Sequence, residues 1–245
     1  MENRDFWLYV CYFFLALFWL SAYVLVARRG FKEKTFGMPI AAMIGNWAWE
    51  WIYGLNLNSP CPLVWETCPE GPLIAANFAS MFLDAFIVYT IFKYGREKMT
   101  NPFARKYYYQ IIIFGLIASF ALQYTFITEV GFPNLNNLTV RTGGTPEFLA
   151  GDEGGTYSGY ILSLLMGILF IKMITDRNSL EGQSFIAALS MMLGNAAAYP
   201  FLAILNELTP FLNVLVGVTL FINFVYVVMT YRKSIELGIN PWTHW

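Results

Sequence analysis

Charge is the scarcest property of this 245-residue sequence. Acidic and basic side chains make up 13% of it, whereas hydrophobic residues make up 57%. A soluble domain carries charge on about a quarter of its residues to cover its surface. The formal net charge is −1, so no basic field attracts nucleic acid. The low content of charged residues argues against a soluble domain, and the lack of net positive charge argues against a nucleic-acid-binding protein. Together with the high hydrophobic content, they predict a protein that resides in a membrane.

Ligands for metals and cofactors are equally scarce. The sequence has one histidine, His244, close to its last residue, which argues against a histidine-based metal site or catalytic triad. It contains no P-loop and no dinucleotide-binding fingerprint. The last apolar segment has no lysine, which argues against a retinal Schiff base. We therefore expect a protein without a metal or a cofactor.

Long apolar runs are what the sequence has in abundance. Because lipid offers backbone groups no hydrogen-bond partners, runs of about 20 residues predict membrane-spanning helices. The first run is longer than a signal-peptide core, so we expect no cleavable signal peptide. The predicted fold is an all-α bundle of seven transmembrane helices in one domain, residues 1–245, with helices at 6–27, 36–56, 73–93, 107–129, 156–175, 184–206 and 211–231.

Basic residues predict the orientation of this bundle. Of the 15 Lys and Arg residues, 13 fall on one side if the chain crosses seven times, and only Arg4 and Arg141 fall on the other. The positive-inside rule places the larger group in the cytoplasm. We therefore expect an outer N-terminus and a cytoplasmic C-terminus. The expected membrane is the endoplasmic reticulum in a eukaryote or the cytoplasmic membrane in a bacterium.

The sequence does not decide the structure of the two predicted outer connections. Cys61 and Cys68 lie in the first of them, six residues apart. They either form a disulfide in an oxidising compartment or stay as two thiols, since spacing alone does not fix geometry. The second connection, residues 130–155, is long for a compact helical protein. It is either a lid or a disordered segment.

Carboxyl groups inside predicted membrane helices indicate function, because they are costly there. Glu50 lies in the second predicted helix, with Asn46 one turn earlier on the same face. Asp84 lies near the middle of the third. Burial favours a neutral carboxylic acid, which can donate a proton. The aromatic residues around Glu50, Trp47, Trp49, Trp51 and Tyr53, are either an interfacial belt or the walls of a cavity that stabilises a cation.

Other polar residues are weaker candidates. Asn223 lies near the middle of the last helix, with Tyr226 about one turn later. Glu129 and Glu207 mark the outer ends of two helices and are also common interfacial residues. Asn195 precedes Pro200 in the sixth helix, and we expect its amide to form an interhelical hydrogen bond.

One segment resembles a known family. Residues 31–53 read FKEKTFGMPIAAMIGNWAWEWIY. This segment is similar to the small membrane-bound terpene cyclases of fungal meroterpenoid and indole-diterpene pathways, of the paxilline and pyripyropene type. The chain length, the number of helices and the step Glu129-Val130-Gly131 also agree. The positions that carry the resemblance are Phe31, Lys32, Lys34, Thr35, Gly37, Met38, Asn46, Trp49, Glu50 and Tyr53.

The resemblance implies an enzyme that protonates a terminal epoxide on an isoprenoid chain and guides a carbocation cyclisation. Glu50 matches the family's acid in the second helix. The family's second acid, an Asp in the last helix, is Asn223 here. Either Asp84 has taken over as the second catalytic carboxyl, or this member performs different chemistry. By the same resemblance the substrate-binding residues are Asn46, Trp49, Tyr53, Glu129, Asn223 and Tyr226.

Two other classes of function stay open on the sequence alone. A transporter would use Glu50 and Asp84 as proton or cation sites, although repeated halves and broken helices are not evident. A receptor or assembly factor would need no chemistry. For the cyclase we expect a lipophilic prenylated small molecule and membrane lipid as partners, and no nucleic acid.

Overall fold

The computed structural model describes residues 2–55, 57, 71–126, 152–205 and 208–245, and every regular element in these ranges is helical. In chain order the elements are α1 (Glu2–Lys32), α2 (Ile40–Gly54), α3 (Gly71–Tyr94), the 3-10 helix η1 (Arg96–Lys98), α4 (Pro102–Lys106), α5 (Tyr108–Thr125), α8 (Asp152–Arg177), α9 (Phe185–Leu205) and α10 (Pro210–Glu236).

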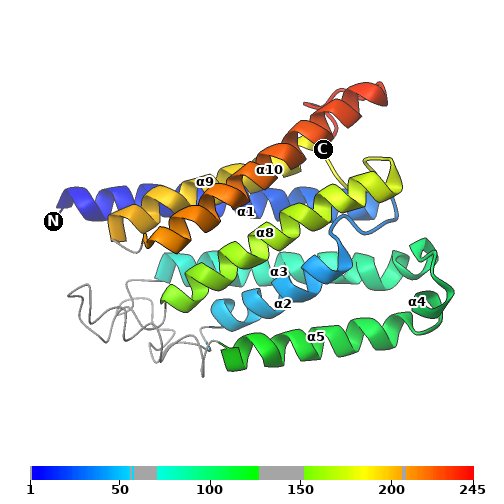
Figure 1. Cartoon of the computed structure of the whole chain (residues 1–245), viewed down its shortest axis with the longest axis horizontal. Helices are drawn as coiled ribbons and strands as arrows, with labels where there is room; N and C mark the ends of the chain where they lie inside the picture. Colours follow the sequence, from blue (N-terminus) through cyan, green and yellow to red (C-terminus); the bar gives the residue numbers. More distant parts are fainter. Residues whose placement is uncertain (1, 56, 58–70, 127–151, 206–207) are drawn as a thin grey trace.

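The long helices run alternately in opposite directions along the bundle (Figure 1). Six of those described are long and apolar enough to cross a membrane: α1, α3, α5, α8, α9 and α10. The remaining long helix, α2, has 15 residues. It is about 22 Å long at ~1.5 Å per residue, shorter than the roughly 30 Å core of a bilayer. An all-helical fold with several membrane spans is confirmed, whereas seven crossings stay a prediction.

The boundaries of α1 and α2 differ from the predicted 6–27 and 36–56. Helix α1 continues to Lys32, because the basic residues after the apolar run are good helix formers. Helix α2 begins only at Ile40, since Pro39 adopts an extended backbone with ψ 133° at the N-cap position. The residues between the two helices form a turn, which explains why α2 is short.

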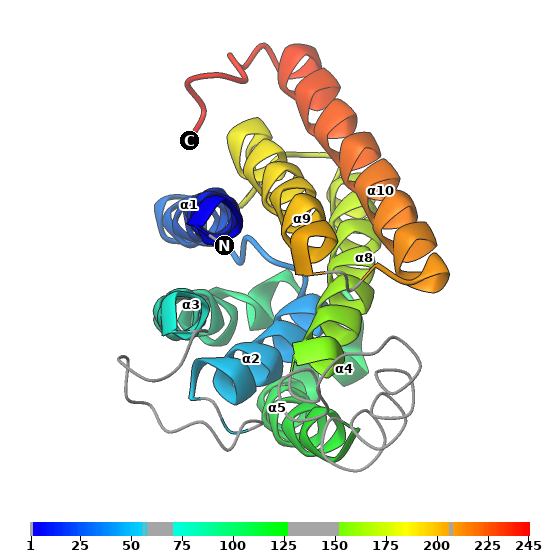
Figure 2. The same ribbon diagram turned by 90° about the vertical axis from the view of Figure 1, so that its left-hand side faces the viewer.

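Helix α2 lies in the interior of the bundle, in contact with α3, α5 and α8 (Figure 2). Glycines permit these close approaches. A Cβ added at Gly54 would lie 3.1 Å from the Asn77 carbonyl oxygen of α3, and one added at Gly45 would lie 2.8 Å from Leu162 of α8. Close packing on both sides fixes the polar face of α2 relative to its neighbours.

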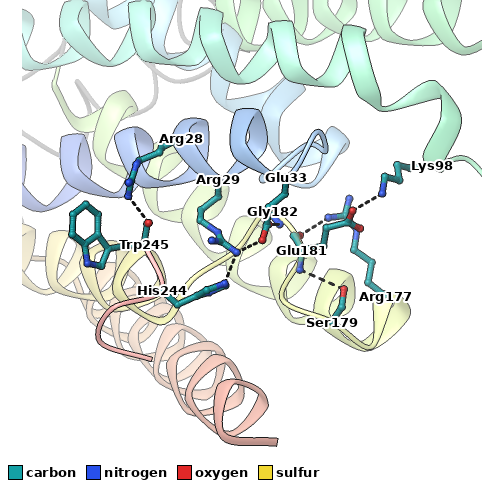
Figure 3. Close-up of polar contacts among 10 residues, drawn as sticks. All are labelled: Arg28, Arg29, Glu33, Lys98, Arg177, Ser179, Glu181, Gly182, His244 and Trp245. Carbon is teal, nitrogen blue, oxygen red and sulfur yellow. Dashed lines mark hydrogen bonds and ion pairs between the residues drawn. The ribbon is translucent and has the colours of Figure 1, made fainter. Parts of the chain in front are cut away.

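A charged cluster joins three segments at the end of the bundle where α2 and α9 begin (Figure 3). We call this cluster the clasp, and it comprises the turns 33–39 and 178–184 and the tail 237–245. Arg29 is 1% exposed and pairs with Glu33. The Arg29 Nη2 atom lies 2.7 Å from His244 Nε2, and Glu33 Oε2 accepts a hydrogen bond of 2.5 Å from the Gly182 amide.

Part of the 31–53 segment serves this clasp. A Cβ added at Gly37 would lie 2.5 Å from the Gly182 carbonyl oxygen, so no larger residue fits without a shift of backbone. Arg177 donates to the carbonyl oxygens of Phe36 and Glu181 at 3.2 and 2.8 Å. The first half of the segment therefore holds helix ends together, while its second half lies within α2.

Candidate active site

Four buried side chains from three helices form one hydrogen-bonded group, which we call the polar network. Asn46 and Glu50 come from α2, Tyr23 from α1 and Asp84 from α3. The Tyr23 hydroxyl donates to Glu50 Oε1 at 2.8 Å. The Asn46 amide nitrogen donates to the Tyr23 oxygen at 2.9 Å and to Asp84 Oδ2 at 2.8 Å. None of the four is more than 8% exposed, so water does not compete for these bonds.

Helix geometry explains how the group assembles. Asn46 and Glu50 are one turn apart, so both point to the same side of α2. Helix α3 packs closely against this side, which brings Asp84 to the amide, and α1 packs against α3. The structure thus joins Asp84 to Glu50 and Asn46, which the sequence had already placed on one face of a helix.

The two oxygens of the Glu50 carboxyl group differ in their hydrogen bonds. Tyr23 has one hydroxyl hydrogen, and its shorter contact is to Glu50 Oε1, since Asn46 Oδ1 is 3.2 Å away. Oε1 is therefore the accepting oxygen of Glu50. Within the described residues Oε2 has no partner, and no basic side chain pairs with either carboxyl. Because an unpaired buried carboxylate is costly, these surroundings favour the neutral acid, and Oε2 is the oxygen to which no described residue donates.

A cavity of about 150 Å³ opens beside the polar network. Its wall comes from α1, α2, α3, α8 and α9, which surround the centre of the bundle in Figure 2. Most of the lining is apolar or aromatic. Besides the network, the polar lining includes Asn77 and Ser80 of α3 and Asn195 of α9, and the aromatic lining includes Trp19, Trp49, Tyr53, Tyr160 and Phe201.

The aromatic residues around Glu50 divide between two positions. Trp49 and Tyr53 line the cavity, with ring centroids 4.4 Å apart. The Trp49 indole donates to Ser158 of α8 at 3.1 Å, which holds the ring in place. Trp47 and Trp51 pair with each other at 5.1 Å and do not line the cavity. Two of the four rings are thus in the wall.

Other predicted site residues lie elsewhere. Asp84 is 0% exposed and, behind Asn46, does not line the cavity. Asn223 is buried outside it, with neither amide atom hydrogen-bonded within the described residues. The Tyr226 hydroxyl donates to Gln183 at 2.9 Å, and the ring lines a smaller neighbouring cavity of about 20 Å³. Glu129, Glu207, Cys61 and Cys68 lie outside the described residues.

Tyr23 is the functional candidate that sequence reasoning missed. It lies in a run so apolar on all sides that no face stands out. Its only sequence signal is a phenolic hydroxyl nine residues before the end of α1. This hydroxyl becomes a functional candidate only because the folded structure brings it into hydrogen-bond contact with Glu50.

A sequence model of the Pyr4-like transmembrane terpene cyclases matches residues 5–234. The chain belongs to this family. It is accordingly a multi-pass membrane protein, which agrees with its six candidate spans.

Several fungal proteins are similar in sequence to this Pyr4-like chain. The Pyr4-family terpene cyclase mfmH of Annulohypoxylon moriforme is 23% identical over 184 residues, 74% of this chain and 64% of the relative. The terpene cyclase ascF of Acremonium egyptiacum is 30% identical over 106 residues, 41% and 33% of the two chains. Asnovolin H synthase nvfL of Aspergillus novofumigatus is 24% identical over 176 residues, 66% and 68%.

The match to mfmH, and the one to the terpene cyclase cle7 of Aspergillus versicolor at 40% coverage, span less than two thirds of the relative. No solved structure matches the chain.

Proposed function

We propose that this chain is a terpene cyclase in which Glu50 protonates the terminal epoxide of an isoprenoid chain. One observation carries the proposal: a buried carboxyl group has one oxygen fixed by Tyr23 and the other without a partner, beside an aromatic-lined cavity. Family membership supports it, since the matched relatives are named terpene cyclases. The substrate class is an epoxidised prenyl chain attached to a polar head, as in a meroterpenoid.

The first step moves one proton and breaks one bond. The Glu50 Oε2–H donates to the epoxide oxygen, and the bond from that oxygen to the tertiary carbon breaks. The oxygen stays as a hydroxyl group and the carbon becomes a cation. Glu50 is left as a carboxylate, and Tyr23 stabilises it by donating to Oε1.

The later steps need a cavity of suitable shape from which water is excluded, and they need no further reagent. Alkene π bonds attack the cation in turn and close rings, and loss of a proton ends the cascade. The rings of Trp49 and Tyr53 present π faces that favour a nearby cation. An apolar wall keeps water from capturing the cation early. The overall change is an isomerisation, so each turnover returns the proton that Glu50 supplied.

Replacement of Glu50 tests the proposal. Glu50→Gln keeps the shape and the acceptor for Tyr23 but removes the transferable proton. General acid catalysis contributes about 10²–10⁴-fold, and we expect cyclisation to fall by at least that range while the variant purifies as a folded protein. Asp176→Asn is the matched control, because Asp176 forms an exposed ion pair with Lys172.

The assay also separates the cyclase from a transporter. Purified protein in detergent is incubated with an aromatic compound bearing an epoxidised farnesyl chain, and products are identified by mass spectrometry and NMR. No gradient exists in detergent, so a transporter forms no product. Absence of cyclised product from the wild type across a panel of such compounds would refute the cyclase, and full cyclisation by Glu50→Gln would refute Glu50 as the donor.

A further inference from the structure

A polar side chain lines the cavity from a helix other than those of the polar network. Asn195 of α9 lines the same cavity, and α2 and α9 lie on opposite sides of the centre of the bundle (Figure 2). Glu50 is ten residues beyond Ile40, the first residue of α2, and Asn195 is ten residues beyond Phe185, the first residue of α9. Both helices begin at the same end of the bundle (Figure 1), and both residues line the one cavity.

The Asn195 amide is unsatisfied. We expected an interhelical hydrogen bond, but the buried Nδ2 atom has no partner among the described residues, and the side chain is 4% exposed. A buried polar group without a partner is destabilising. Because Asn195 also lines the cavity, a ligand bound there lies next to this amide.

The backbone around Asn195 is held from two sides. The Tyr160 hydroxyl of α8 donates to the Asn195 carbonyl oxygen at 3.1 Å. On the other side Gly194 packs on Trp19 of α1, where an added Cβ would lie 2.7 Å from the indole. The amide is therefore presented from a fixed helix rather than from a mobile loop, which is what a specific binding site requires.

We propose that Asn195 binds an acceptor oxygen on the polar head of the substrate, such as a ketone or ester carbonyl. The inference rests on the proposed function, because it takes the cavity as the substrate's binding place. The unpartnered Nδ2–H group needs an acceptor, which an ammonium group is not, because it only donates. The epoxide oxygen has to lie at Glu50 Oε2, so the oxygen at Asn195 is a different one.

Binding of unreactive probes tests this site without turnover. The probes are an aryl ketone with a farnesyl chain and no epoxide, and the same compound with the ketone reduced to a methylene group. Trp19 and Trp49 line the cavity, so tryptophan fluorescence of the purified protein in detergent reports the Kd. We expect the wild type to bind the ketone about fivefold more tightly than the methylene compound, the usual size of one neutral hydrogen bond.

Two variants assign the preference to Asn195. Asn195→Leu has similar volume and no donor, and we expect it to bind both probes equally. Ser190→Ala removes a buried polar group of the same helix that does not line the cavity, and it should keep the fivefold preference. A wild type without preference for the ketone would overturn the inference, and so would a preference that persists in Asn195→Leu.

The result is distinct from that of the cyclase assay. If the ketone preference depends on Asn195 but no epoxide is ever cyclised, the proposed function fails and the binding site stands. If epoxides are cyclised but the wild type binds the ketone and the methylene compound with equal Kd, the proposed function stands and the Asn195 site fails.

Discussion

Tyr23→Phe tests whether the polar network positions the acid. The variant keeps the ring, which packs at 5.7 Å from Trp19, and removes only the hydroxyl. Glu50 Oε1 then loses its donor and the Asn46 amide loses one acceptor. The bond to Glu50 is the one that stabilises the carboxylate formed during epoxide opening, and a hydrogen bond to a developing charge contributes roughly 1–3 kcal/mol. That corresponds to a kcat lower by about 5- to 150-fold.

The measurement is the pair kcat and KM for an epoxyprenyl substrate. A positioning role lowers kcat and leaves KM within about threefold, because the lost bond stabilises the charge that develops on Glu50 rather than the bound substrate. Tyr108→Phe is the matched control. It also removes a buried hydroxyl bond, at 2.9 Å to the Ile91 carbonyl oxygen, but at a distance from the cavity. A Tyr23→Phe enzyme with wild-type kcat, or one changed only in KM, would contradict the reasoning.

Further predictions concern Asp84, the clasp and the topology. Asp84→Asn should lower kcat by less than about tenfold, because Asp84 does not line the cavity; a loss as large as that of Glu50→Gln would make Asp84 the second catalytic acid. Burial and the nearby Arg29 lower the pKa of His244. His244 in the docked tail therefore binds fewer protons than in a tail released from the clasp, so docking of residues 237–245 weakens as the pH falls below about 6.5. Hydrogen exchange of residues 237–245 should rise there, and His244→Gln should abolish the pH dependence. Tags in the 95–107 connection and after residue 245 should both report the cytoplasm. Tags on opposite sides would refute seven crossings, and two tags accessible from outside would refute the predicted orientation.

The helices could be predicted from the sequence because a bilayer imposes a simple rule of length and polarity. Each long helix described in the structure corresponds to an apolar run. The short α2 departs from its run because Pro39 fixes an extended residue and Gly37 has to meet Gly182 of another turn. That second contact joins residues far apart in the chain, so no local pattern could show it.

The candidate site was predictable only in part, for a related reason. Helical spacing placed Asn46 and Glu50 on one face, and both line the cavity. Tyr23 and Asn195 became candidates only through their surroundings in the structure. The Tyr23 hydroxyl donates a hydrogen bond to Glu50, and the Asn195 Nδ2 atom has no hydrogen-bond partner within the described residues. For Asn223 the reverse holds. The resemblance makes it a candidate, but in the structure it is buried and does not line the cavity.

The division of the 31–53 segment explains how charge and chemistry coexist in so apolar a chain. Its permanent cations, together with Arg29 and Arg177, lie at the end of the bundle where α2 and α9 begin, and Glu33 and backbone carbonyl groups pair with some of them. Its one carboxyl in the bundle interior, Glu50, meets only neutral donors and a second acid through Asn46. A cation beside Glu50 would hold it as a carboxylate and remove the proton that it has to donate. In the proposed mechanism, keeping basic side chains away from Glu50 is therefore a requirement of acid catalysis, as well as of membrane insertion.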